Sequence, residues 1–122
     1  MKIVTNKDGY VNSFAILGEL IDSIEVKHED IDLNFFQQHY GSYKLVDGSL
    51  VYDEEKDKQI ADENELERLR ILREKECFSV INRGQAWYNS LTDGQYEDLQ
   101  TWYQAWLNVT KTRVIPEKPA WI

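Results

Sequence analysis

The chain has little cysteine, proline or glycine: one, two and six residues among 122. A lone thiol, Cys77, cannot form an internal disulfide, so the cysteine content does not imply an oxidising compartment. We expect it to be a structural thiol within a helix. The scarcity of proline and glycine argues against long linkers. No apolar run approaches the length of a membrane span, and the N-terminus lacks the apolar region of a signal peptide.

Basic side chains are outnumbered, with 14 Lys and Arg against 22 Asp and Glu and a net charge of −8. Proteins that bind nucleic acid need basic surface to displace counterions from phosphates, so this balance argues against nucleic acid and against anionic membranes. It favours solubility and a basic or apolar protein partner. Hydrophobic residues make up 42% of the chain and charged residues 30%, which is typical of a globular protein.

Motifs that carry chemistry are also missing. His28 and His39 are the only histidines, and no cysteine or carboxylate motif accompanies them at the spacing of a metal site. The acidic pair Asp30 and Asp32 lacks the glycine and the distal glutamate of a calcium loop. There is no glycine-rich phosphate loop and no nucleophile elbow. We therefore expect no enzyme activity, no metal and no cofactor.

Residues 1–53 are predicted to form a small antiparallel β domain. One hairpin is indicated around residues 6–9, where Gly9 can take the positive φ of a turn. A stronger hairpin signal surrounds Asp47-Gly48, a two-residue loop suited to a type I′ turn. Between these hairpins, residues 30–39 favour a short helix with Asp30 or Asp32 as its cap.

Residues 54–89 are predicted to form one long amphipathic helix, beginning near residue 57. Leu66, Leu69 and Leu72 recur at steps of three, and apolar residues continue at helical spacing towards residue 88. The apolar stripe is narrow and flanked by charge, as in coiled coils. This helix could therefore be a spacer or an element of homo-oligomerisation.

Residues 90–122 are predicted to form a second helix and a Pro/Trp tail. Thr92 can cap this helix and Gln95 can answer it, which is the pattern of a capping box. The helix should end near residue 109 or 110, before Pro116. It would form a helical hairpin with the long helix. Together with the β domain of residues 1–53, this hairpin gives a predicted fold class of α+β.

Aromatic residues gather near the end of the chain, and they are its most informative feature. A protein this small can hardly bury all fifteen Trp, Tyr and Phe residues. The aromatic face of the last helix is either packed in the core or left for a partner, and both alternatives stay open at this point. We predict a partner-binding surface that contains Trp102, Tyr103, Trp106 and Trp121.

The same region resembles the C-terminal region of phage tail assembly chaperones, a family that includes tail-fibre assembly proteins. The resemblance lies in Arg83, Trp87, Ser90-Leu91-Thr92, Gln95, Leu99, the run Trp102-Tyr-Gln-Ala-Trp-Leu107 and the closing Pro116-x-x-Pro119-x-Trp121. Gln104 stands where that family usually has arginine. Residues 1–53, with Ala15 to Gly18 and Val46 to Gly48, are similar to a small β domain at the start of tail and baseplate accessory proteins from phages of Gram-positive bacteria.

The resemblance implies a phage or prophage protein of the host cytoplasm. Such a protein binds a tail-fibre, receptor-binding or other tail protein and helps it fold, trimerise or join the tail. An alternative is a structural baseplate or tail-fibre component that is retained in the virion. A third hypothesis is an inhibitor of a host protein, because small acidic proteins can act by mimicking a surface.

Overall fold

The fold is α+β, as the sequence predicts: antiparallel strands occupy the first part of the chain and helices the rest. The computed structural model describes residues 1–122. The chain divides into two units, residues 1–62 and 63–122, which join within the long helix α2 (Glu54–Arg73). Each unit has its own cluster of buried apolar side chains, and each is described by itself.

The first strands of the chain form a three-stranded antiparallel sheet in the order β2-β1-β3. β1 (Lys2–Thr5) pairs with β2 (Val11–Ala15) on one side and with β3 (Ile24–Glu25) on the other. The turn between β1 and β2 is the predicted one. Gly9 has a φ of 87° there, a conformation that residues with a Cβ rarely adopt.

A second hairpin confirms the Asp47-Gly48 prediction. It consists of β4 (Tyr43–Val46) and β5 (Ser49–Tyr52), paired in the antiparallel sense. Asp47 and Gly48 have φ angles of 51° and 81°. A type I′ turn requires positive φ at both central residues, and its twist matches that of the strands it joins.

The short helix α1 (Leu33–His39) also lies where the sequence predicts it. Of the two predicted caps, Asp32 is the one used, and its carboxylate accepts hydrogen bonds from the backbone of residues 34 and 35. Phe36 points from α1 into the core of the first unit. That core consists of Met1, Ile3, Val11, Val26, Phe36 and Tyr43.

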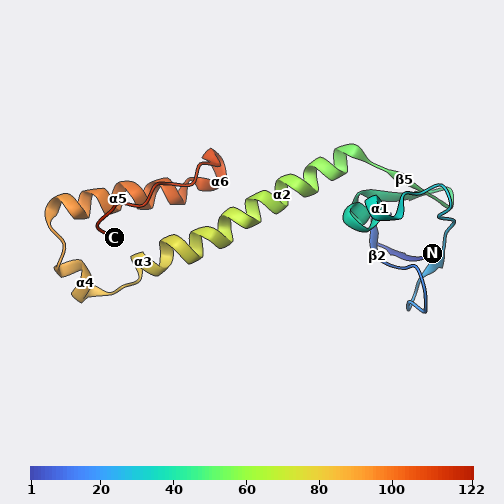
Figure 1. Cartoon of the computed structure of the whole chain (residues 1–122), viewed down its shortest axis with the longest axis horizontal. Helices are drawn as coiled ribbons and strands as arrows, with labels where there is room; N and C mark the ends of the chain where they lie inside the picture. Colours follow the sequence, from blue (N-terminus) through green and yellow to red (C-terminus); the bar gives the residue numbers. More distant parts are fainter. The chain divides into compact units, whose positions relative to one another are not determined.

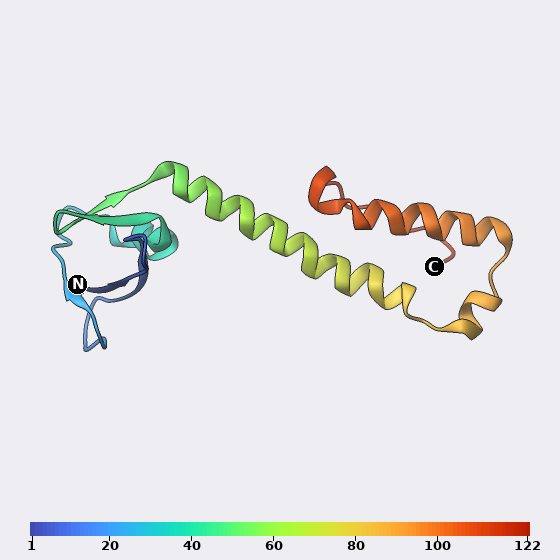
Figure 2. The ribbon, with the colours of Figure 1, turned by 180° about the vertical axis from the view of Figure 1, so that it is seen from behind.

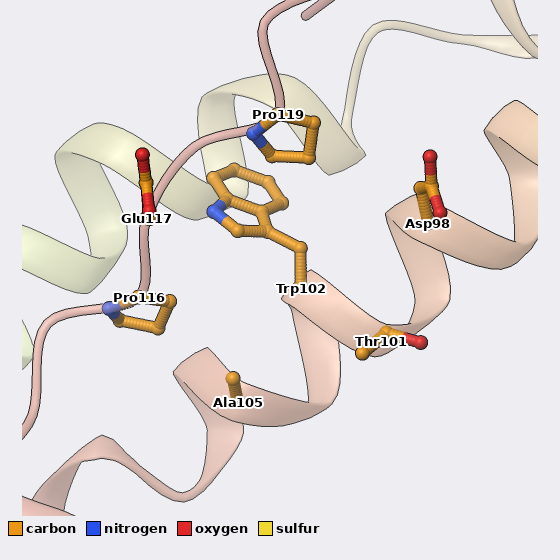
Figure 3. Close-up of a pocket in the computed structure, with 7 residues that line it drawn as sticks. All are labelled: Asp98, Thr101, Trp102, Ala105, Pro116, Glu117 and Pro119. Carbon is orange, nitrogen blue, oxygen red and sulfur yellow. The ribbon is translucent and has the colours of Figure 1, made fainter.

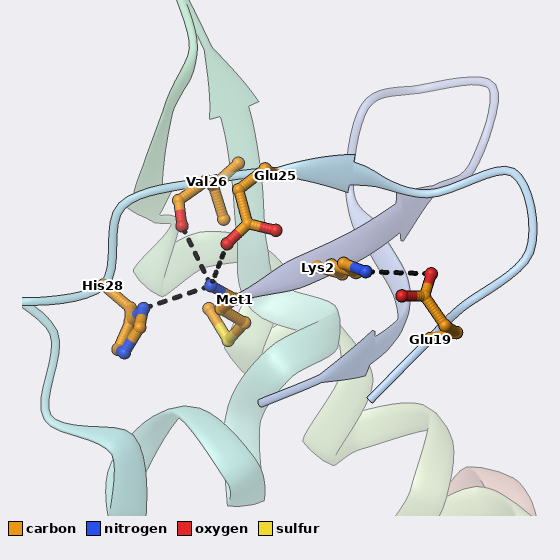
Figure 4. Close-up of polar contacts among 6 residues, drawn as sticks. All are labelled: Met1, Lys2, Glu19, Glu25, Val26 and His28. Atoms are coloured by element: carbon orange, nitrogen blue, oxygen red, sulfur yellow. Dashed lines mark hydrogen bonds and ion pairs between the residues drawn. The ribbon is translucent and has the colours of Figure 1, made fainter. Parts of the chain in front are cut away.

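The amino group of Met1 lies inside the first unit and holds the start of β1 to the segment around β3 (Figure 4). It lies 2.9 Å from Glu25 Oε1 and 3.2 Å from both the Val26 carbonyl oxygen and His28 Nδ1. The hydrogen bond from this ammonium lowers the pKa of the Glu25 carboxyl. Buried charge is satisfied here by several partners, which fixes the position of the first strand.

Two aspartates fix the start of α2 to the strands of the first unit. The first is Asp53, whose Oδ1 accepts a hydrogen bond from the Lys56 backbone N–H, as a helix cap does. Its Oδ2 accepts a hydrogen bond of 2.7 Å from the Tyr10 hydroxyl. These hydrogen bonds favour the ionised form and lower the pKa of Asp53.

The second aspartate, Asp57, lies one turn further along α2 and has three side-chain partners. Its Oδ1 accepts a hydrogen bond of 2.6 Å from Ser42 Oγ, and its Oδ2 accepts one of 2.6 Å from the Tyr52 hydroxyl. His39 Nδ1 lies 3.0 Å from Oδ1. These contacts lower the pKa of Asp57 to about 2, and the bond to this carboxylate raises the pKa of Tyr52 to about 12.

The long helix is shorter than the predicted span to residue 89. From α2 the chain continues through a π-helical segment, η2 (Glu74–Phe78), into α3 (Ser79–Ile81), and the helix ends there. Gly84 has a φ of 97°, which no helix can contain, so α4 (Gln85–Asn89) is a separate helix. The prediction of one continuous helix over residues 57–89 is therefore wrong at its C-terminal end.

The predicted helical hairpin is confirmed within the second unit. α5 (Asp93–Leu107) packs on the part of α2 that belongs to this unit, and the short helix α6 (Val109–Thr112) follows it. The tail after α6 runs back along α5, and the C-terminus lies between α5 and α3 (Figures 1 and 2). The core of this unit consists of Leu69, Cys77, Val80, Leu99, Trp102, Trp106 and Val109.

Candidate partner-binding site

The predicted contact residues lie on α5 and on the tail, and a capping box fixes where α5 begins. Thr92 Oγ1 accepts a hydrogen bond of 3.1 Å from the Gln95 backbone N–H. In return, Gln95 Oε1 accepts one of 3.0 Å from the Thr92 backbone N–H. Both bonds of the predicted motif are therefore present, and they satisfy two groups that a helix end leaves free.

One face of α5 is buried in the core of the second unit. Leu99, Trp102 and Trp106 follow one another at steps of three and four, and the two tryptophans are only 4% and 2% exposed. Trp102 and Trp106, two of the four predicted contact residues, therefore serve the core, and a partner cannot reach most of their surface. An apolar stripe on a helix can pack in the core or bind a partner. The burial of Leu99, Trp102 and Trp106 shows that this stripe packs in the core.

A second face of α5 keeps apolar surface in contact with solvent. It consists of Tyr96, Tyr103 and Leu107, at steps of seven and four, and we name these three residues the tyrosine strip. Tyr96 is 49% exposed, Leu107 is exposed and Tyr103 is half-buried. Tyr103 was among the predicted contact residues, whereas Tyr96 and Leu107 were not. Their spacing of eleven residues, three helical turns, is the signal that could have identified them.

Trp121, the fourth predicted contact residue, is half-buried against α4. Its ring stacks on the ring of Trp87, which belongs to α4. The Arg83 guanidinium, just before α4, lies 4.9 Å from the centre of the same Trp87 ring. Both tryptophans pack against the core of the second unit. The Pro/Trp tail is thus part of the fold of this unit, and part of Trp121 remains in contact with solvent.

A pocket of about 370 Å³ lies between α5 and the tail, and we name it the tail pocket (Figure 3). The Trp102 indole stands in the middle of it, with Pro119 on one side and Pro116 on the other. The pocket is lined by Asp98, Thr101, Trp102, Ala105, Pro116, Glu117 and Pro119. The pocket is open to solvent, and most of its lining is apolar, with the carboxylates at its margin.

The charged groups of the tail pocket are both acidic. Asp98 and Glu117 are exposed, lie on opposite sides of the Trp102 ring, and form no ion pair or hydrogen bond within the chain. α5 as a whole carries three carboxylates and no Lys or Arg. The potential at this pocket therefore favours a cation.

Three indole N–H groups in the second unit have no hydrogen-bond partner. They are the Nε1 atoms of Trp102, Trp106 and Trp121, all buried. A buried donor without a partner costs about 1–3 kcal/mol relative to a satisfied one. These unsatisfied donors lie within the unit that carries the tyrosine strip and the tail pocket.

The remaining reactive groups are engaged in the fold. Burial raises the pKa of the Cys77 thiol to about 11, so it stays protonated at neutral pH and is a poor nucleophile. His39 is held by Asp57 in the first unit. No group of three His, Cys, Asp or Glu side chains could hold a metal ion.

No helix has both the length and the apolar character to span a bilayer. The exposed aromatic and acidic surfaces of the second unit are suited to binding.

Comparison with known proteins covers the first unit. Residues 1–59 match the family model described as "Protein of unknown function (DUF2977)". The matched residues contain all five strands, α1 and the first turn and a half of α2. No curated protein and no solved structure matched the chain. The family description assigns no activity to the matched residues.

Proposed function

We propose that the chain is a non-enzymatic assembly chaperone for a phage tail fibre, receptor-binding protein or related tail protein. The observation that carries the proposal is the tyrosine strip, where Tyr96 and Leu107 remain exposed beside half-buried Tyr103 on a capped helix. Large aromatic side chains with few rotatable bonds are the residues that dominate binding at protein interfaces. The resemblance of residues 83–121 to tail assembly chaperones supports the same function.

The contact surface that we propose consists of the tyrosine strip and Trp121. Trp102 and Trp106 act from behind, because their burial fixes α5 and therefore the spacing of the exposed rings. A chaperone that holds an unassembled, aggregation-prone partner needs apolar area on a body that stays soluble. The first unit provides solubility: its 13 carboxylates and six lysines give it a net charge of −7. Such a protein would act in the host cytoplasm.

Co-expression with a tail-fibre gene from the same genome tests the proposal. We expect the yield of soluble, trimeric fibre to rise when the chain is present, and to fall back with a double Tyr96→Ala, Tyr103→Ala variant. Ile71→Ala is the matched control, because it removes an exposed apolar side chain from α2 of the same unit. Equal trimer yield with and without the wild-type chain would rule out a chaperone role.

The alternative is a structural component of the baseplate or tail fibre that remains in the particle. A second apolar surface favours it: Leu17 and Ile21, in the segment between β2 and β3, are 90% and 87% exposed. An oligomer formed through α2 would serve that role as well. Mass spectrometry of purified particles separates the two functions, since a chaperone is absent from them and a structural component is present in stoichiometric amounts.

A further inference from the structure

We propose that the tail pocket binds a lysine or arginine side chain presented by the partner polypeptide. The inference rests on the proposed function in one respect only, namely that the partner is a protein. The ligand chemistry follows from three properties of the pocket: its apolar lining, its two carboxylates and the unpaired Trp102 indole donor. Each property selects a different part of such a residue.

The apolar interior suits the aliphatic stem. Ala105, Pro116 and Pro119 line the pocket with hydrocarbon, together with the Trp102 indole (Figure 3). Its volume of about 370 Å³ is at the small end of ligand pockets, so it has room for one long side chain and adjoining backbone. Lysine and arginine pack their methylene groups on such surfaces while the charged end stays in polar surroundings.

The carboxylates suit the charged end. Asp98 comes from α5 and Glu117 from the tail, so a basic side chain that enters the pocket meets a carboxylate at either margin. Neither carboxylate is neutralised by a basic side chain of this protein. The basic residues near the end of the chain, Lys111, Arg113 and Lys118, do not line the pocket. The site therefore has a negative charge that an incoming cation would satisfy.

The Trp102 indole contributes an unpaired hydrogen-bond donor. Trp102 Nε1 is buried on the side of Pro116 and Glu117 without a hydrogen-bond partner. A carbonyl oxygen of the bound polypeptide could accept this hydrogen bond if the covering tail moves slightly, and that bond would offset the cost of the unpaired donor.

No hydrogen bond to α5 opposes that adjustment of the tail. Residues 114–122 form no hydrogen bond with α5, and their only backbone hydrogen bonds as donors are Val114 to Thr112 Oγ1 and Ile122 to the Pro119 carbonyl. The tail is therefore held on α5 by apolar packing, with Trp121 and Ile122 as its anchor against the core. Between residue 113 and that anchor, the segment that carries Pro116 and Glu117 can shift without breaking a hydrogen bond to the helix.

Nuclear magnetic resonance of the full chain tests the inference. The probe is a terminally capped peptide, Gly-Ala-Lys-Ala-Gly, compared with the same peptide containing norleucine, which keeps the stem and lacks the charge. We expect the lysine peptide to shift the Trp102 indole N–H resonance in a saturable way, and to bind about three-fold more tightly than the norleucine peptide, as one exposed ion pair allows.

Matched variants locate the effect. Asp98→Asn with Glu117→Gln should remove the preference for lysine, whereas Glu97→Gln with Glu76→Gln changes the net charge equally at exposed positions outside the pocket and should preserve it. Unchanged amide spectra elsewhere would show that all variants fold. Equal binding of both peptides, an unaltered preference in the pocket variant, or no shift of the Trp102 resonance would each overturn the inference.

The two proposals can fail separately. If the lysine peptide leaves the Trp102 resonance unchanged while co-expression still raises the yield of trimeric fibre, the pocket inference is wrong and the chaperone function stands. If the peptide binds selectively and co-expression has no effect, the pocket is a binding site for basic polypeptides and the chaperone function is wrong.

Discussion

The ring of Trp121 stacks on the ring of Trp87, with their centres 6.3 Å apart and their planes inclined by 24°. The two residues are 34 positions apart in sequence. Their contact therefore attaches the C-terminal tail to α4. Both rings also contact the core of that unit. The tail pocket depends on this anchor, since Trp121 fixes the end of the segment that carries Pro116, Glu117 and Pro119.

Replacing Trp121 with alanine should therefore destabilise the second unit. The loss of the ring pair alone is worth about 0.5–1.5 kcal/mol in the free energy of unfolding, and lost buried area adds to it. Trp121→Phe keeps a ring and should cost less. Chemical denaturation followed by the fluorescence of the remaining tryptophans measures both. An alanine variant as stable as the phenylalanine variant would contradict a stabilising role for the stacked pair.

Leu69 and Ile71 offer a matched pair on α2. Leu69 is fully buried in the core of the second unit, whereas Ile71 is 59% exposed. Leu69→Ala should lower the free energy of unfolding by about 2–5 kcal/mol, because it leaves a cavity beside the α5 core residues. Ile71→Ala should change it by less than about 0.5 kcal/mol. Similar losses in both variants would mean that the packing of α2 differs from that described.

Two glycines should respond to alanine in opposite directions. Gly84 has a φ of 97° between α3 and α4, where a Cβ introduces strain of about 1–3 kcal/mol. Gly94 lies in the first turn of α5 with open space around its Cα, so Gly94→Ala should stabilise the unit by about 0.5–1 kcal/mol. Thermal unfolding of the two variants tests the pair, and a stabilising Gly84→Ala would show that the break after α3 is not needed.

The Asp57 site predicts how the first unit responds to pH. The pKa of Asp57 is lowered to about 2, so its hydrogen bonds contribute fully above the ordinary value of 3.8 and are lost as the pH falls towards 2. The pKa of Tyr52 is raised to about 12, so its contribution is complete below pH 10 and is lost as the pH rises towards 12. The first unit should thus weaken at both extremes.

Circular dichroism across the two pH ranges measures this response. Asp57→Asn should reduce the loss of stability on the acid side, because no carboxylate remains at that site to be protonated. We call the loss of stability at low pH the acid limb and the loss at high pH the alkaline limb. Glu55→Gln, on the same turn of α2 with an exposed side chain, should leave both limbs unchanged. An acid limb of wild-type slope in the Asp57→Asn variant would assign the acid sensitivity to other carboxylates.

Sequence reasoning succeeded where a structure is decided by neighbouring residues. The capping box of Thr92 and Gln95, the Asp32 cap and the Asp47-Gly48 turn all depend on bonds or dihedral angles within three residues, and all three are present. Periodicity likewise predicted both helices of the hairpin. The break at Gly84 was missed, because an isolated glycine in an apolar pattern does not reveal the sign of its φ.

The site was harder to predict, because burial is decided by contacts between distant residues. The spacing of Trp102 and Trp106 indicates a shared face but not what covers it, and Leu69 covers it from α2. The tail pocket requires the tail to return along α5, for which the sequence carries only Pro116, Pro119 and Trp121 as signals. The unpartnered indole donors could not be foreseen at all, since they depend on exact placement.

The π-helical segment η2 limits how α2 could join a second copy of itself. The wider turn at residues 74–78 rotates every later side chain around the helix axis. A heptad repeat of apolar residues on α2 would therefore face a different direction after this segment than before it. On the N-terminal side of that turn, Leu69 already faces α5 of its own chain. A coiled coil between α2 helices of two chains would therefore be short and confined to the residues before Leu69.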